Sequence, residues 1–133
     1  MSAEKIGFWI TPPEMYNPLN AEFGFDFDAC PFPRPEGFDG LTVEWGSATY
    51  CNPPWPGSTG GIKLHDWVGK AIKEHAKGKT VVLALPHYVF PSIVAPLWPL
   101  NPEVRGGAVQ WVNPKGKRSG RRFMYFLFIL RKP

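Results

Sequence analysis

The sequence has little of what membrane-spanning, disulfide-stabilised and metal-binding proteins need. Its longest apolar run, Phe123 to Leu130, is far shorter than the roughly 18 residues of a transmembrane helix, so we expect no contact with a membrane. The only two cysteines, Cys30 and Cys51, form no spaced framework, and no signal-peptide pattern opens the chain. Cysteines and histidines also lack metal-ligand spacing. These absences predict a cytoplasmic protein without a metal site.

Length and composition favour one ordered domain. The 133 residues fit a single domain over 1–133 with one core, and they leave no room for a separate recognition domain of ordinary size. Proline (16), glycine (14) and aromatic residues (15%) are abundant, which indicates many fixed turns and argues against disorder. Any partner is therefore expected to be held by loops of this one domain.

Positive charge is concentrated at one end of the chain. The formal net charge of +4 is a modest bias toward polyanionic partners such as nucleic acid. The basic residues near the C-terminal end are Lys115, Lys117, Arg118, Arg121, Arg122, Arg131 and Lys132. We expect that end to face phosphates.

The first half of the chain predicts a loop, a helix and two strands. Residues 8–13 mix aromatics with prolines and indicate an ordered loop. Glu14 to Glu22 predicts a short helix interrupted near Pro18. The alternation from Phe23 to Ala29 predicts a strand ending at Asp28, and Leu41 to Trp45 predicts a minor strand.

The second half predicts an α/β fold. The expected elements are a strand at Ala48–Cys51, a glycine-rich loop at Pro56–Gly61, a helix at Ile62–Lys77 followed by Gly78, a strand at Thr80–Leu85, one or two helical turns within Ser92–Leu100, and strands at Ala108–Val112 and Phe123–Leu130. Strand, helix and strand in this order make a crossover unit, and the last two strands are expected to pair antiparallel. The prediction is a trimmed Rossmann-like sheet, mainly parallel, with an antiparallel C-terminal pair.

The tetrapeptide Asn52-Pro53-Pro54-Trp55 stands where α/β proteins place ligands, at the carboxyl end of a strand. The Asn52 amide oxygen and the Pro53 carbonyl are able to accept hydrogen bonds from an aromatic amine and localise its lone pair. The prolines hold these carbonyls still, and Trp55 offers a face for a displaced base. A plain turn after a strand is the alternative interpretation.

The tetrapeptide and several other segments, in the same order along the chain, resemble those of the phage-type DNA N6-adenine methyltransferases, the Dam family. The matching segments cover roughly residues 8 to 90, which is more specific than the tetrapeptide alone. They are Trp9-Ile10-Thr11-Pro12, Phe25-Asp26-Phe27-Asp28-Ala29-Cys30, Asp39-Gly40-Leu41 with Trp45, Cys51-Asn52-Pro53-Pro54-Trp55, Trp67-Val68 with Lys70-Ala71, and Val81-Val82-Leu83 with Leu85-Pro86.

The resemblance implies an S-adenosylmethionine-dependent methyltransferase fold and methyl transfer to N6 of adenine in DNA. It implies that S-adenosylmethionine binds beside Asn52, with Asp28 accepting hydrogen bonds from the ribose hydroxyls. Thr11 and Pro12 are expected to close over the cofactor, or else to start a helix. Asp39 is expected to reach the cofactor adenine, or else only to start a turn. If a phage encodes the chain, the host cytoplasm is its expected location.

Two departures from the family pattern keep other functions open. His87-Tyr88-Val89-Phe90 replaces a polar, arginine-containing segment, and Trp55 replaces the commoner tyrosine. The general motif Asn-Pro-Pro-aromatic also serves methylation of RNA amines and of a protein glutamine amide. An inactive nucleic-acid-binding relative is a further alternative.

The loop from Asn113 to Arg122 is the candidate DNA contact. Its basic residues could follow a phosphate backbone and give sequence-independent, salt-dependent affinity, or they could simply be solvated. They are Lys115, Lys117, Arg118, Arg121 and Arg122. Because so small an enzyme has little surface with which to span DNA, a homodimer is a possible partner state.

Overall fold

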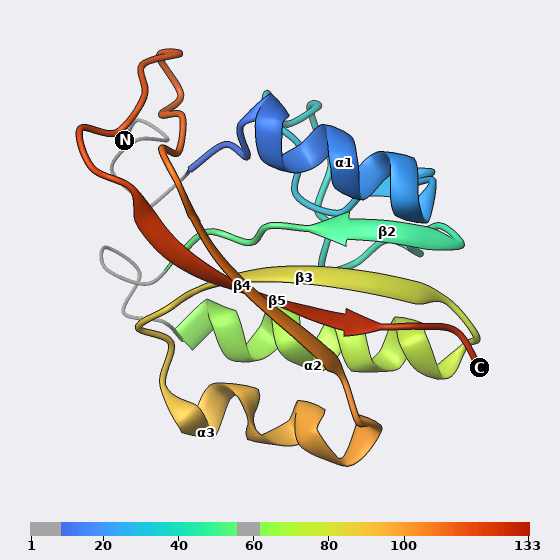
Figure 1. The fold of residues 1–133 in the computed structure, drawn as a ribbon. Coiled ribbons are helices and arrows are strands. Elements are labelled where there is room, and N and C mark those ends of the chain that lie inside the picture. The colour runs from blue at the N-terminus through green and yellow to red at the C-terminus, as the bar shows by residue number, and fades with distance from the viewer. Residues whose placement is uncertain (1–8, 56–61) are drawn as a thin grey trace.

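The computed structural model describes residues 9–55 and 62–133, so the expected loop at 56–61 lies outside the described residues. Figure 1 shows the helices and strands coloured in chain order. The elements are α1 (Pro13–Phe23), β1 (Phe27–Asp28), β2 (Ala48–Cys51), α2 (Ile62–Ala76), β3 (Thr80–Pro86), α3 (Pro91–Val94), the 3₁₀ helix η2 (Ala95–Leu100), β4 (Glu103–Val109) and β5 (Phe123–Leu130).

The strands form one mixed sheet in the order β1-β2-β3-β5-β4. β1, β2 and β3 run parallel, with Asp28 opposite Tyr50 and Cys51 opposite Leu83. β5 lies between β3 and β4 and is antiparallel to both. The α/β class and the antiparallel C-terminal pair are therefore confirmed.

The sheet is covered on both faces, and β3 shows why. Every residue of β3 after Thr80 is buried, as its continuous apolar run predicts. Val81, Leu83 and Leu85 belong to the core cluster shared with α2, α3 and η2. Val82 and Ala84 belong to the cluster shared with α1. Figure 1 shows α1 on one side of the sheet and α2 and α3 on the other.

Helix α2 forms as its periodicity predicts. Trp67, Val68 and Ala71 are buried against the sheet, and the helix ends before Gly78. Gly78 has a φ of 92° and donates its N–H to the carbonyl of His75, so it caps the helix as expected. Within residues 9–55 and 62–133, no helix combines the length and apolarity that a bilayer crossing requires.

Two expectations for the first helix and strand are wrong. Helix α1 continues through Pro18, which is exposed, so the hydrogen bond that proline cannot donate is lost at the solvent side. The helix also takes up Phe23 and ends at Gly24, whose φ is 60°. The strand is therefore limited to Phe27–Asp28.

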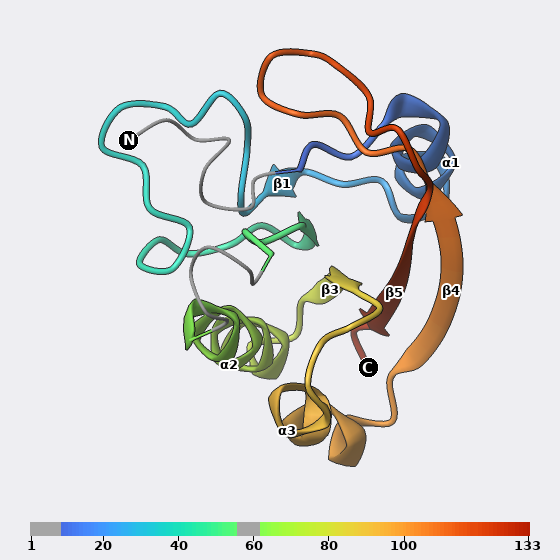
Figure 2. The ribbon, with the colours of Figure 1, turned by 90° about the vertical axis from the view of Figure 1, so that its left-hand side faces the viewer.

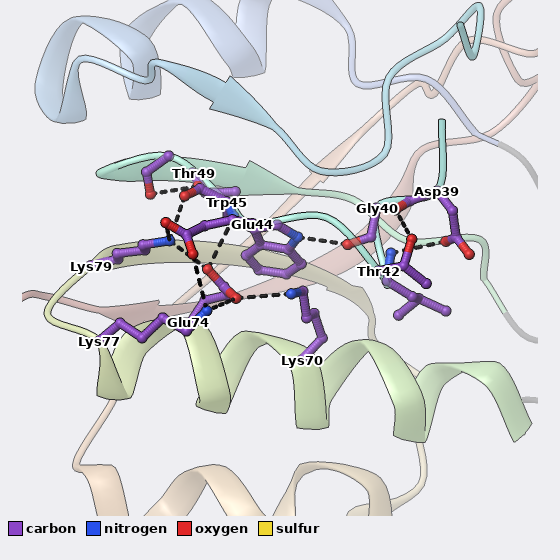
Figure 3. Close-up of polar contacts among 12 residues, drawn as sticks. Asp39, Gly40, Thr42, Glu44, Trp45, Thr49, Lys70, Glu74, Lys77 and Lys79 are labelled. Carbon is purple, nitrogen blue, oxygen red and sulfur yellow. Dashed lines mark hydrogen bonds and ion pairs between the residues drawn. The ribbon is translucent and has the colours of Figure 1, made fainter. Parts of the chain in front are cut away.

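The segment Leu41–Trp45 is a turn followed by irregular chain and not the expected minor strand, because side chains hold it (Figure 3). The Trp45 N–H donates to Glu74 Oε1 over 3.0 Å, and its indole N–H donates to the Gly40 carbonyl over 2.7 Å. Gly40 has no room for a side chain, since an added Cβ would lie 1.9 Å from the Ala29 carbonyl oxygen.

Glu74 is a buried carboxylate in the middle of this arrangement, with 1% of its side chain exposed. Lys70 donates to Oε2 over 2.8 Å and Lys77 over 3.0 Å, while Lys79 donates to Oε1 over 2.5 Å. Burial alone would raise the pKa of Glu74, but these hydrogen bonds and that from the Trp45 N–H hold the pKa well below its usual range. Glu74 thus joins α2 to the turn before β2 and to the start of β3.

Strand β4 begins earlier than the expected Ala108–Val112. It spans Glu103–Val109, and each of its residues pairs with β5. The sequence pattern did not predict the first part of β4, because Gly106 and Gly107 in the middle of the strand interrupt the apolar alternation. The short helical turns expected within residues 92–100 are confirmed as parts of α3 and η2.

Candidate functional site

Asp28 and Asn52 lie on either side of a cavity at the edge where β1 and β2 end. Asp28 is the last residue of β1, and Asn52 follows the last residue of β2. Because the two strands are parallel neighbours, both residues come to the same edge of the sheet. Figure 2 views the molecule from this edge.

The cavity between them, called here the Asp28–Asn52 cavity, measures about 200 Å³. Its polar walls include Thr11, Asp28 and Asn52, and its aromatic walls include Trp9, Tyr16 and Tyr50. Cavities for drug-sized ligands usually measure roughly 300 to 1,000 Å³. The described walls therefore enclose room for part of such a ligand, for example a sugar with its neighbouring groups.

Asn52 is held rigidly at the wall of this cavity, with 7% of its surface exposed. Its Nδ2 donates to the Trp9 carbonyl over 2.6 Å and to Thr11 Oγ1 over 3.4 Å. Its Oδ1 accepts from Trp55 Nε1 over 3.1 Å. Since an amide oxygen has two lone pairs, Oδ1 can accept one further hydrogen bond.

Thr11 and Pro12 have different places. Thr11 lines the cavity, and its hydroxyl lies 2.5 Å from the hydroxyl of Tyr50, whose pKa is raised mainly by burial. Pro12 is buried at the N-cap of α1, and its carbonyl accepts from the N–H groups of Met15 and Tyr16. Thr11 therefore reaches the cavity, whereas Pro12 starts the helix.

Asp28 is half-buried, and its carboxylate faces few donors. Burial raises the pKa of Asp28, and the Cys30 N–H, which donates to Oδ1 over 3.0 Å, only partly opposes this. The pKa of Tyr16 is also raised, first by burial and then by the negative charge of Asp28. A carboxylate that has several acceptor positions fits a ligand with hydroxyl donors, such as a ribose.

Trp55 does not offer the free face expected for a displaced base. It is 2% exposed, and its ring packs edge to face on Trp111 with centroids 4.6 Å apart. The cause is the hydrogen bond from its Nε1 to Asn52 together with the long-range contact to Trp111. Pro53 is buried and Pro54 half-buried. The tetrapeptide is therefore a packed corner.

Asp39 does not reach the cavity. It is exposed, and its Oδ1 accepts from the Leu41 N–H over 2.9 Å, so it forms the turn that was the alternative expectation. Sequence reasoning missed Tyr16 and Tyr50 in the cavity wall. Tyr50 could have been found as the strand neighbour of Asp28, but no local signal marks Tyr16.

The loop at residues 113–122 is connected to residues 9–11, which line the Asp28–Asn52 cavity. Ile10 and Val112 exchange backbone hydrogen bonds of 2.7 and 3.1 Å, and the rings of Trp9 and Phe123 lie 6.1 Å apart. All five basic residues of the loop are exposed, namely Lys115, Lys117, Arg118, Arg121 and Arg122. Arg118 forms an ion pair with Glu14 of α1, which ties that residue to the fold.

Among the described residues there is no group of three or more acidic, histidine or cysteine side chains able to hold a metal ion. Cys30 and Cys51 are both free thiols. In comparisons with known proteins, the chain matches no family model, no curated protein and no solved structure.

Proposed function

We propose that this protein is an S-adenosylmethionine-dependent methyltransferase with a trimmed Rossmann-like fold, acting on N6 of adenine in DNA. The observation that carries the proposal is the meeting of Thr11, Asp28 and Asn52 around one cavity. These residues belong to three separate segments of the resemblance, and the cavity lies at the strand ends where α/β proteins bind ligands.

On the cofactor side, Asp28 accepts hydrogen bonds from the ribose hydroxyls, and Thr11 closes the cavity from the N-terminal segment. The aromatic rings of Tyr16 and Tyr50 form its apolar walls. S-adenosylmethionine supplies an activated methyl group on a sulfonium. The new N–C bond would form as the C–S bond breaks, and the methylated amine, then a cation, would release its proton to water. Positioning by the protein is therefore enough, and no general base with a shifted pKa is needed.

On the acceptor side, Asn52 Oδ1 uses its second lone pair to accept a hydrogen bond from the amine, and the Pro53 carbonyl accepts another. The bonds from Asn52 to Trp9, Thr11 and Trp55 fix the direction of that oxygen before the substrate arrives. Such preorganised acceptors stabilise charge that develops on the amine during transfer.

Calorimetric titration with S-adenosylmethionine tests the cofactor side. Asp28→Asn removes the charged acceptor, and hydrogen bonds to charged groups contribute roughly 1.5 to 3 kcal/mol, so we expect at least tenfold weaker binding. Asp39→Asn is the matched control, because Asp39 is exposed and turned away into its own loop. Equal affinities of the two variants would refute the role of Asp28.

A nucleic-acid-binding protein without turnover is the second candidate. The packing of Trp55 favours this candidate. The Trp55 indole N–H already donates to one lone pair of Asn52 Oδ1, and the Trp55 ring has no exposed face. Absence of S-adenosylmethionine binding by the wild-type protein, together with retained DNA binding, would select it. Labelled methyl donor offered with DNA, RNA and protein distinguishes the acceptors if the cofactor binds.

A further inference from the structure

The loop that follows β3 exposes aromatic rings at the edge where the parallel strands end. Tyr88 is 48% exposed and Phe90 is 65% exposed. The loop leaves Pro86, the last residue of β3, at the end of the sheet to which β1 and β2 also run, and this end faces the viewer in Figure 2. Such rings are suited to stacking on planar ligands, because any nucleobase has a π-face.

Tyr88 is held in place by its neighbours. His87 donates its N–H to the Met124 carbonyl over 3.2 Å, and this anchors the loop on β5. The rings of His87 and Tyr88 are perpendicular, with centroids 5.3 Å apart. A held ring loses little conformational freedom when a ligand stacks on it.

Tyr88 is also linked to the packed corner that Asn52-Pro53-Pro54-Trp55 forms. Its ring lies edge to face with Trp55 at 6.4 Å, and Trp55 in turn donates to Asn52. Asn52 lines the Asp28–Asn52 cavity, and Trp55 connects Asn52 to the Tyr88 ring. The cavity and the Tyr88 ring are thus linked through two residues, Asn52 and Trp55.

The basic loop 113–122 is connected to the same corner through Trp111. Trp111 packs on Trp55, and it exchanges hydrogen bonds of 2.7 and 3.1 Å with Ser119, which closes the basic loop 113–122. Lys117 and Arg121 of that loop are exposed. Aromatic rings beside a basic loop are complementary to the bases and phosphates of a nucleic-acid strand.

We propose that the Tyr88 ring, and not Trp55, is the stacking platform for the acceptor base, a nucleobase displaced from a DNA strand whose phosphates lie along loop 113–122. The inference rests on the proposed function, and it adds the base-binding residue. Tyr88 is thereby a substrate-binding residue contributed by the segment that departs from the family pattern.

Fluorescence anisotropy with a labelled single-stranded oligodeoxynucleotide tests the platform. We expect Tyr88→Ala to weaken binding about fivefold to a hundredfold, and Tyr88→Phe to restore it because the ring face is retained. Trp98→Ala is the matched control. Trp98 is similarly exposed, but it packs on Phe128, which belongs to the core cluster shared with α2, α3 and η2, whereas Trp55 and Trp111 belong to the other cluster.

The site-specific readout is an oligonucleotide with 2-aminopurine in place of one adenine, whose fluorescence falls on stacking. We expect quenching by wild type and Tyr88→Phe, and its loss with Tyr88→Ala. Equal DNA affinities and equal quenching for Tyr88→Ala and Trp98→Ala would overturn the proposal. If wild type fails to bind S-adenosylmethionine while Tyr88→Ala alone loses DNA affinity, the methyltransferase function fails and the platform stands.

Discussion

Replacing Glu74 by glutamine removes one charge from the most buried ionic contact of the fold while keeping the side-chain shape. The carboxylate accepts from three lysines and from the Trp45 N–H (Figure 3). An amide has one acceptor atom, so its NH₂ group must face either the Lys79 or the Lys70 ammonium. Breaking a buried ion pair costs about 3–5 kcal/mol. We expect about 3 kcal/mol for Glu74→Gln, because Lys77 is half-exposed and regains water.

The assay is thermal and urea unfolding followed by circular dichroism. For a domain of this size, about 3 kcal/mol corresponds to a melting temperature lower by about 10 °C. Glu44→Gln is the control, since Glu44 contacts Lys77 and Lys79 but is 73% exposed, and such surface pairs contribute about 0–1 kcal/mol. Equal melting temperatures for the two variants would refute the reasoning.

The same contact predicts a pH dependence. Because the pKa of Glu74 is lower in the folded protein than in the unfolded chain, its stabilisation is present above the unfolded pKa, about 4.3, and is lost as the pH falls below it. The difference in free energy of unfolding between wild type and Glu74→Gln is therefore expected to shrink below about pH 4. A difference that stayed constant down to pH 3 would contradict this cause.

Three further outcomes follow from the structure. Burial raises the pKa of Asp28, so S-adenosylmethionine affinity measured by calorimetry should fall as the pH drops through that raised value. Asp28→Asn should flatten this pH dependence. Parallel pH profiles for wild type and Asp28→Asn would contradict it. The double variant Lys117→Ala with Arg121→Ala should reduce the slope of log DNA affinity against log salt by about 2, and an unchanged slope would remove the loop from the DNA contact. Gly40→Ala should lower the free energy of unfolding, measured in urea, by about 3 kcal/mol or more, because the added Cβ meets the Ala29 carbonyl. Gly120→Ala should lower it little, because the added Cβ has open space. Similar losses for the two variants would contradict the close approach at Gly40.

The local sequence pattern was enough to predict the elements whose own residues form an apolar face. β3 and α2 follow from the buried run at Thr80–Leu85 and the helical spacing from Leu64 to Ile72. The meeting of Asp28 and Asn52 was also predictable, since Asp28 ends one parallel strand, Asn52 directly follows its neighbour, and the ends of such strands share an edge.

Long-range contacts explain what the sequence did not reveal. The Leu41–Trp45 segment has strand-like residues, yet Glu74 takes the Trp45 N–H that a strand would use for pairing. β4 has glycines where an apolar pattern is expected, and it exists because β5 pairs along its whole length. The burial of Trp55 depends on Trp111, which no local pattern places beside it.

Methyl transfer to DNA is the most direct test of the account. Wild-type protein is incubated with labelled S-adenosylmethionine and DNA, the DNA is digested to nucleosides, and the labelled nucleoside is identified. The account predicts label in N6-methyladenine, and a loss of about a hundredfold to a thousandfold in turnover for Asn52→Ala with cofactor affinity retained. DNA without labelled adenine from a protein that binds the cofactor, or an Asn52→Ala variant as active as wild type, would contradict it.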